Sequence, residues 1–531
     1  MRNHDPVRTA IMKHLLVSVA EEMGARLQYS AYSPNIKEQR DFSCAIFDAN
    51  GSLIAQAAHI PVHLGAMPLS VQACVSALTL APEDVAIVND PYRGGTHLPD
   101  ITMISPIFCD TPQPFTLLGF VANRAHHADV GGMSPGSMPL SQEIYQEGII
   151  IPPIKLVTGG NINADLWDFF LANVRTPRER AGDLRAQMAA NRIGSERMLE
   201  FATRYGAEQL TQDMDGLLRY SEQMTRHLIA GLPDGSYAFE DVLDNDGISQ
   251  NPLRIAATVT IAGEDIHVDF TGTSPQQKGC MNAVFPITLS ATTYAIRCLL
   301  GLDIPANSGC LVPIHLIAPK GSLVNAQPPA AVAGGNVETA QRIVDVVLGA
   351  FAQACPERIP AASQGTMNNV TIGGWDSHRR QPYAYYETIG GGMGARPTKE
   401  GASAIHTHMT NTMNTPVEAL EYAYPFRVTR YAIRQDSGGN GHYHGGNGIC
   451  RDFEFLDEAE VTLLSDRRTH APYGLAGGGP GQPGRNLLYR KKTIQTLPGK
   501  CHLTLHRGER LSIETPGGGG YGKEDTIKAT M

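Results

Sequence analysis

The sequence predicts an α+β protein with a mixed α/β core, long central helices and a β-rich C-terminal part. Long runs with apolar residues at helical spacing, short apolar runs typical of buried strands, and glycine clusters near the C-terminus all indicate this class. We expect four segments: residues 1–175 with the site motifs, 176–235 as long helices, 236–425 as an α/β segment, and 426–531 as the β-rich, glycine-rich segment.

The first segment is expected to begin with a helix over residues 6–28, where apolar residues form one stripe. Residues 41–59 are expected to form two strands, because Asn50-Gly51 favours a tight turn between them. A second helix is predicted over residues 64–80.

Two short apolar runs, 85–88 and 115–122, are expected to be buried strands. Each run ends abruptly in polar residues, and the ends of strands in mixed sheets commonly carry functional residues.

Further along the chain, residues 254–272 show strand alternation around a turn, and residues 337–351 predict an apolar helix. Residues 177–232 are expected to be helical, with breaks near Gly194, Gly206 and Gly231.

Composition excludes several classes of function. The net charge of −9, without a block of lysine and arginine, argues against nucleic acid as a partner, because phosphate binding requires a positive surface. No stretch approaches the roughly 20 apolar residues needed to cross a bilayer. The nine cysteines are scattered without a CxxC pair, which favours reduced thiols and a cytoplasmic protein.

Potential metal ligands are concentrated after the two apolar runs. His97 and Asp100 follow the first, and His126 and Asp129 repeat the same spacing after the second. Imidazole and carboxylate ligands together suit zinc, manganese or iron. The two pairs could therefore close around one divalent ion.

Structural roles compete with this interpretation. Each histidine could be packed or solvated, and Asp41 and Asp90 could be turn or capping residues. His59 and His63 are expected to hydrogen-bond a buried turn, although they could join the site.

On the long helix, three polar residues spaced by four form one stripe, which we expect to face solvent, with a cavity-lining role as the alternative. These residues are Asp183, Gln187 and Asn191.

The C-terminal glycine run resembles a nucleotide-binding P-loop only in its spacing. Glu524 stands where serine or threonine should bind magnesium, and too few residues follow Lys523 for the required helix. Any ATP is therefore expected to bind elsewhere.

Beyond these spacings, the chain resembles the hydantoinase B/5-oxoprolinase family. The resemblance lies in motifs spread over nearly the whole chain, at residues 89–100, 126–132, 182–187, 269–274, 390–396 and 516–522.

The resemblance implies the hydrolytic B-type component of an ATP-dependent cyclic amidohydrolase. A hydantoinase A-type partner would bind ATP with magnesium and activate the substrate as a phosphate, and a metal-activated water would open the lactam or hydantoin ring. The two subunits would form a hetero-oligomer. The alternative is a subunit of a ketone carboxylase of the acetone or acetophenone carboxylase type.

When the family's site residues are carried over to the matching motifs, the resemblance implies a metal-dependent site at Asp41, His97, Asp100 and His126. Asp129 would be a further ligand. The motif leaves open which of His126 and His127 binds the ion. Asp41 is the candidate general base, and His127 is a second candidate catalytic residue.

The missing nucleotide loop generates the first prediction. The purified chain alone is expected to show no ATP hydrolysis, which a phosphate-release assay would measure. Tight binding of ATP to the isolated chain would contradict the division into two subunits.

Overall fold

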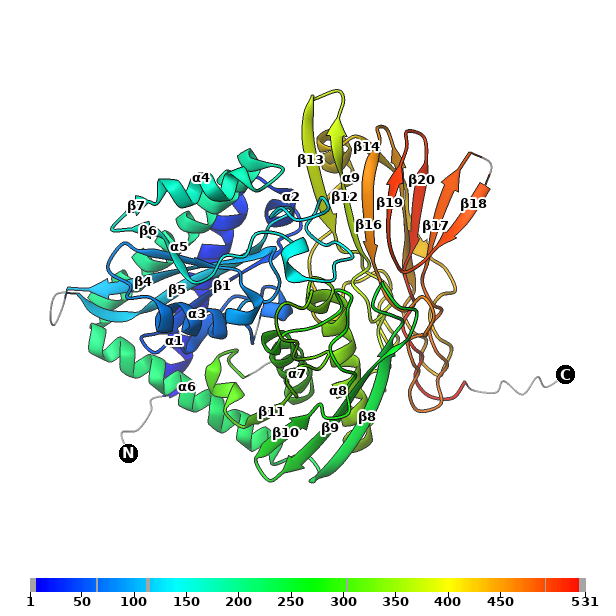
Figure 1. The fold of residues 1–531 in the computed structure, drawn as a ribbon. Coiled ribbons are helices and arrows are strands. Elements are labelled where there is room, and N and C mark those ends of the chain that lie inside the picture. The colour runs from blue at the N-terminus through cyan, green and yellow to red at the C-terminus, as the bar shows by residue number, and fades with distance from the viewer. Residues whose placement is uncertain (1–5, 64, 111–114, 302–303, 492, 525–531) are drawn as a thin grey trace.

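Four β-sheets with helices packed against them make up the described part of the chain (Figure 1). The computed structural model describes residues 6–524, apart from 64, 111–114, 302–303 and 492. The predicted α+β class is confirmed. No described helix combines the length and the apolar character needed to cross a membrane.

The first sheet is antiparallel throughout, with strand order β2-β1-β5-β4-β3-β6-β7. Its strands are β1 (Phe42–Asp48), β2 (Leu53–Gln56), β3 (Val85–Val88), β4 (Asp100–Cys109), β5 (Thr116–His126), β6 (Ile154–Thr158) and β7 (Asn161–Ile162). The predicted hairpin at Asn50-Gly51 and the predicted strand 85–88 are confirmed. The strand predicted over 115–122 extends further, so His126 ends the strand and does not follow it.

Helices cover both faces of this sheet. On one face α1 (Pro6–Ser30) and α5 (Pro177–Tyr205) pack against Val121 and Ala125 of β5. On the other face α3 (Met67–Ala77) packs against Phe120 and Ala122. Because side chains alternate along a strand, the even-numbered residues of β5 face α3.

Of the three breaks predicted in the long helical stretch, those near Gly206 and Gly231 are confirmed, and the one near Gly194 is wrong. Gly206 separates α5 from α6 (Ala207–Ile229), whereas Gly194 lies inside α5. A Cβ at Gly194 would lie 2.4 Å from the Met23 sulfur, so this glycine allows α1 to approach closely. Gly231 follows the end of α6.

A second sheet, with order β11-β10-β9-β8, packs with α7 (Phe285–Leu300) and α8 (Ala340–Ala354) in the large apolar core. Its strands are β8 (Gly235–Leu243), β9 (Leu253–Ala262), β10 (Asp265–Asp269) and β11 (Ile314–Ile317). The helix predicted over 337–351 begins with a π-helical turn, η5 (Gly335–Thr339), which continues into α8.

Two further sheets face each other across an aromatic core at the C-terminal side of the molecule (Figure 1). Their orders are β13-β12-β16-β19 and β14-β15-β20-β17-β18. The strands are β12 (Asn369–Asp376), β13 (Gln381–Glu387), β14 (Phe426–Arg434), β15 (Gly448–Phe455), β16 (Ala459–Leu464), β17 (Arg485–Arg490), β18 (Thr493–Leu497), β19 (Lys500–Leu505) and β20 (Arg510–Glu514). The β-rich C-terminal part thus also includes two strands that precede residue 425.

The remaining short helices connect these units. They are α2 (Pro34–Lys37), α4 (Ala164–Ala172) and α9 (Val417–Ala423), with 3-10 turns η1 (Pro61–His63), η2 (Pro91–Arg93), η3 (Ile144–Gln146) and η4 (Ser308–Leu311).

Buried ion pairs join the second sheet to the C-terminal sheets. Arg342 of α8 lies 2.9 Å from Asp241 of β8 and 3.0 Å from Asp466, which follows β16. Asp466 also lies 2.7 Å from Lys500 of β19. Removing one member would leave an uncompensated buried charge, so this cluster fixes the relative position of the two units.

The glycine clusters pack backbone against backbone. Residues 517–520 contact glycine segments near residues 393, 438–446 and 474–479, and they are buried. A Cβ added at Gly518 would lie 2.1 Å from the carbonyl oxygen of Met393.

This packing generates the second prediction. Gly518→Ala is expected to destabilise the protein by about 3 kcal/mol, because the backbone of Met393 must move to admit a methyl group. Gly231→Ala is the matched control, since its Cβ would meet only the Leu228 carbonyl oxygen, at 3.5 Å. Thermal unfolding of both variants measures the difference, and equal midpoints would contradict the packing argument.

Candidate metal centre

The site begins with the register of three neighbouring strands. Asp100, the first residue of β4, pairs directly with His126, the last residue of β5. On the other side of β5, Asp41 immediately precedes β1, and its carbonyl oxygen accepts a hydrogen bond from the His126 amide at 3.0 Å. Antiparallel pairing therefore brings these residues to one end of the sheet, although they are far apart in sequence.

His97 joins this group from the loop before β4. Its Nε2 lies 3.0 Å from Asp100 Oδ1, and His126 Nδ1 lies 3.3 Å from the same oxygen. Thr96 donates a hydrogen bond to Asp100 Oδ2 at 2.7 Å. One potential ligand atom from each of His97, Asp100 and His126 lies within 4.8 Å of the others.

A third imidazole, His63, also contacts Asp100. Its Nε2 lies 3.4 Å from Asp100 Oδ2, and its Nδ1 lies 2.8 Å from the Ser43 hydroxyl. His59 and His63 were expected to hydrogen-bond a buried turn, but His59 Nδ1 instead accepts from the amide of Cys44 within strand β1. His63 instead reaches the edge of the site.

Burial governs the electrostatics of the centre. It lowers the pKa of His126 to about 4 and also lowers that of His63, so both imidazoles are neutral at pH 7. Burial would raise the pKa of Asp100, but His97, His126 and His63 outweigh it and hold that pKa well below its usual range. Burial, together with the Asp100 charge, raises the pKa of Asp41 well above its usual range.

These residues fit a divalent cation. The neutral imidazoles of His126 and His63 retain lone pairs, and they lie beside the ionised carboxylate of Asp100. His126 Nε2 and His97 Nδ1 have no hydrogen-bond partner among the described residues. Two nitrogens and an oxygen in a water-poor site suit zinc, manganese or iron.

Two other units complete the surroundings of the centre. Asn336 of the π-turn η5 places its Nδ2 3.1 Å from His97 Nε2. Tyr386 of β13 stacks on His126, with ring centroids 4.3 Å apart, and its hydroxyl donates to Asn369 at 2.8 Å. Sequence reasoning missed these residues because no local spacing links them to residues 97–126.

His127 lies on the opposite side of the strand end from the centre. Its Nε2 lies 3.0 Å from Gln187 Oε1 of α5, and burial lowers its pKa to about 4. Alternation along β5 thus favours His126 as the residue facing Asp100.

The polar stripe of α5 does not face solvent as expected. Gln187 and Asn191 are buried against the sheet, where both bond to Asn123 of β5. Asp183 is also buried and accepts from the backbone amides of Tyr32 and Ser33. The stripe therefore joins α5 to the sheet and to the segment before α2.

The structure does not bring Asp129 into the group around Asp100. Its Oδ1 accepts from the backbone amides of Gly131 and Arg175, and its Oδ2 lies 3.0 Å from the Arg175 guanidinium. A carboxylate whose two oxygens are occupied in this way stabilises its own loop. The repeated His-x-x-Asp spacing did not reveal this, because His126 lies in the strand and Asp129 lies beyond it.

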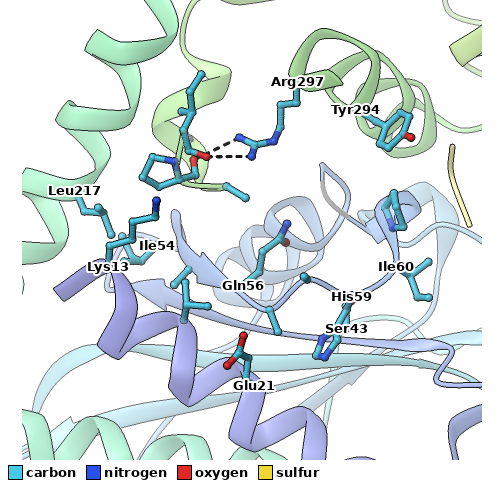
Figure 2. Close-up of a pocket in the computed structure, with 18 residues that line it drawn as sticks. Lys13, Glu21, Ser43, Ile54, Gln56, His59, Ile60, Leu217, Tyr294 and Arg297 are labelled. Atoms are coloured by element: carbon cyan, nitrogen blue, oxygen red, sulfur yellow. Dashed lines mark hydrogen bonds between the residues drawn. The ribbon is translucent and has the colours of Figure 1, made fainter. Parts of the chain in front are cut away.

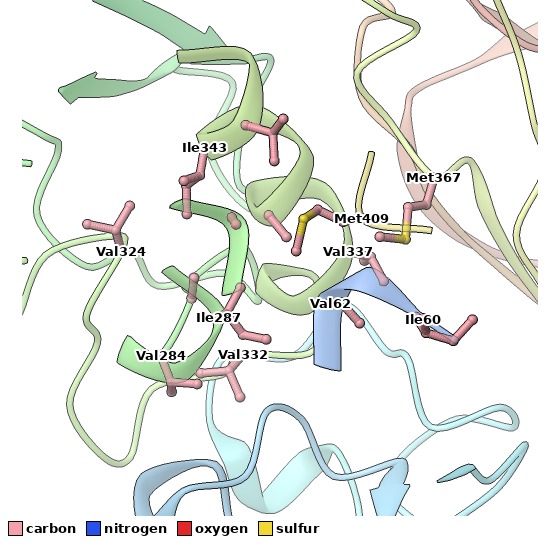
Figure 3. Close-up of a cluster of buried hydrophobic side chains, with 14 of the residues drawn as sticks. Ile60, Val62, Val284, Ile287, Val324, Val332, Val337, Ile343, Met367 and Met409 are labelled. Carbon is pink, nitrogen blue, oxygen red and sulfur yellow. The ribbon is translucent and has the colours of Figure 1, made fainter. Parts of the chain in front are cut away.

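An apolar cluster packs near the centre where three units meet. It contains Ile60, Val62 of η1, Val337 of η5, Met367 and Met409 (Figure 3). The Val62 amide donates to the Met409 carbonyl at 3.3 Å. His97, Asp100 and His126 are consequently at most 2% exposed.

A cavity of about 350 Å³ lies beside the centre, between α1, β2 and α7 (Figure 2). Ser43 lines this cavity and bonds to His63, so a single imidazole separates the cavity wall from Asp100. Arg297, at its upper edge in Figure 2, donates to the carbonyl of Ile304 at 3.1 Å.

The family model for hydantoinase B/oxoprolinase matches residues 5–524. The chain belongs to this family. It is 43% identical to an uncharacterised protein of Methanocaldococcus jannaschii, with 98% of this chain and 91% of that protein aligned. It is 40% identical to 5-oxoprolinase 1 of Arabidopsis thaliana, of which it spans 42%, and 98% of this chain is aligned. It is 32% identical to the putative B component of a D-/L-hydantoinase from a Pseudomonas strain, over 98% and 90% of the two chains.

Solved structures agree with this membership. The ATP-dependent caprolactamase of Pseudomonas jessenii superposes with a TM-score of 0.91 at 28% identity, over 98% of this chain and 92% of that one. An acetone carboxylase gives a TM-score of 0.90 at 18% identity, over 98% and 76% of the two chains, and thus shares the fold.

The two adjacent histidines generate the third prediction. His126→Ala is expected to lose most of the bound metal, because it removes a ligand atom. His127→Ala should retain the metal and lose about 1–3 kcal/mol of stability, because Gln187 Oε1 becomes unpartnered. Elemental analysis with thermal unfolding measures both effects. If His127→Ala lost the metal and His126→Ala kept it, the ligand would be His127 and not His126.

Proposed function

We propose that this chain is the hydrolytic subunit of an ATP-dependent cyclic amide hydrolase. One observation carries the proposal: His97, Asp100 and His126 converge in a single buried group, with Asp41 at the same end of the sheet. Family membership and the likeness to the caprolactamase support the reaction class.

His97, Asp100 and His126 would hold the divalent ion in this proposal. When bound, such an ion polarises an oxygen and lowers the pKa of water, which provides a nucleophile at neutral pH. Tyr386 and Asn336 keep the imidazoles of His126 and His97 in place through the stack and the 3.1 Å contact.

Asp41 is the proposed general base. A general base that is positioned next to the reacting water typically accelerates reaction by about 10²–10⁴-fold. The apolar cluster around Val62 and Val337 limits the access of bulk water, which would otherwise remove the phosphate from an activated substrate before its ring is opened.

Amide resonance makes a cyclic amide a poor electrophile, and phosphorylation of its oxygen removes that resonance. We assign this activation, and the ATP with magnesium that it needs, to an A-type partner in a hetero-oligomer. The Pseudomonas relative is named as one component of a hydantoinase, which supports a partner of this kind. Ketone carboxylation is the alternative, and assays with 5-oxoproline, hydantoins and acetone separate the two reactions.

The fourth prediction separates ligand from base. In complex with the partner, His97→Ala should lose both metal and ring opening. Asp41→Asn should keep the metal and lose about 10²–10⁴-fold in ring opening. ATP turnover by the partner is expected to continue in both variants, uncoupled from hydrolysis.

Elemental analysis, product formation and phosphate release measure these three quantities. Asp165→Asn, a change at an exposed carboxylate in the first turn of α4, is the control and should match the wild type. Wild-type metal content in His97→Ala would remove His97 from the ligand set and contradict the proposal.

A further inference from the structure

The cavity beside the centre carries charges of both signs next to apolar side chains. It encloses about 350 Å³, which is within the usual range for a site that binds a small molecule. Figure 2 shows Arg297 at its upper edge and Glu21 at its lower edge, with the apolar side chains of Ile54 and Leu217 at heights between them. A molecule in the cavity therefore meets a positive and a negative group at separate points.

Arg297 of α7 presents its positive charge to the cavity without a carboxylate partner in the described part of the chain. Its Nη1 and Nη2 donate to the backbone carbonyls of Pro305 and Ile304, at 3.4 and 3.1 Å, and Nη1 also lies 3.5 Å from the Cys310 sulfur. These three contacts orient the guanidinium, but they use only three of its five N–H groups and carry no negative charge. A guanidinium held in this way can bind a carboxylate through its remaining donors.

Glu21 supplies the negative charge from α1. Its side chain is exposed at the cavity, and it forms no ion pair within the described residues. Its neighbour Glu22, by contrast, lies 2.8 Å from the Arg197 guanidinium. Glu21 is thus the carboxylate of this helical turn that remains for a cation in the cavity.

Ring opening of a lactam creates a matching pair of charges. Net addition of water across the C–N bond leaves a carboxylate at one end of the released chain and an amine, protonated at neutral pH, at the other. Opening of a hydantoin instead leaves a carboxylate and an uncharged ureido group. Of these two products, that of the lactam carries charges of both signs.

We infer that the cavity receives the linear amino acid released from a lactam, with its carboxylate on Arg297 and its ammonium group on Glu21. The inference rests on the proposed function and narrows the substrate class to lactams. Ser43 in the cavity wall lies 2.8 Å from His63, and His63 contacts Asp100. The binding place for the product is therefore one imidazole ring away from the centre.

Binding of three ω-amino acids tests the inference without metal or partner. The purified, metal-free chain is titrated in a calorimeter at low salt with 4-aminobutanoate, 5-aminopentanoate and 6-aminohexanoate. The best-bound of the three is expected to bind about tenfold more tightly than the alkanoate or the alkylamine of the same length, because each analogue lacks one ion pair. The uncharged lactam of the same length should bind no better than these analogues.

Variants of the two charged residues assign the ends of the ligand. Glu21→Gln should bind the amino acid only as tightly as the alkanoate, because the ammonium group loses its partner. Arg297→Gln should bind it only as tightly as the alkylamine, and Arg297→Lys, which keeps the charge if the glutamine protein unfolds, should lie between. Glu22→Gln is the matched control, since its carboxylate pairs with Arg197, and it should match the wild type.

Three results overturn the inference. The first is equal affinity for the amino acid and its singly charged analogues, and the second is a preference for the amino acid that survives in Glu21→Gln. The third is loss of that preference in Lys13→Met, at a second cation of the cavity wall, when Arg297→Gln retains it.

Equal binding of the lactam would assign the cavity to the substrate and would also overturn the inference. Because the titration uses neither ion nor partner, failure of the proposed function is seen separately, as absent metal or absent ring opening in the complex.

Discussion

The antiparallel register of β1, β5 and β4 is the constraint on which the rest of the site depends. It places Asp100 opposite His126 and brings the Asp41 carbonyl to the His126 amide. A slip of one residue would turn His126 to the α5 face and His127 to the centre, because side chains alternate along a strand. The packing of Phe120 and Ala122 against α3 opposes such a slip.

The centre also depends on how separate units meet. Asn336 lies in the turn before α8 and Tyr386 lies in β13, and both contact the imidazoles of the first sheet. The buried ion pairs of Arg342 with Asp241 and Asp466 hold those units together. At this junction His97, Asp100 and His126 are at most 2% exposed to solvent.

Several buried polar side chains around the end of β5 hold the backbone in place. Gln187 and Asn191 of α5 hydrogen-bond the Asn123 side chain of β5. Asp129 pairs with the Arg175 guanidinium and so holds the loop that follows the strand. These interactions place the backbone of residues 123–129 so that His126 faces Asp100 and His127 faces α5. Polar residues next to a candidate metal centre can therefore hold the backbone in position without binding the ion.

Sequence alone identified the α+β class, the strand at residues 85–88 and the hairpin at Asn50-Gly51, because these depend on local spacing. It also predicted that His126 joins His97 and Asp100, because each lies near the end of an apolar run. Tertiary structure decided the remainder. Spacing by four places Asp183, Gln187 and Asn191 on one stripe, but it does not say that the stripe faces the sheet. His63, Asn336 and Tyr386 reach the centre only through contacts between distant segments, and no local periodicity encodes those contacts.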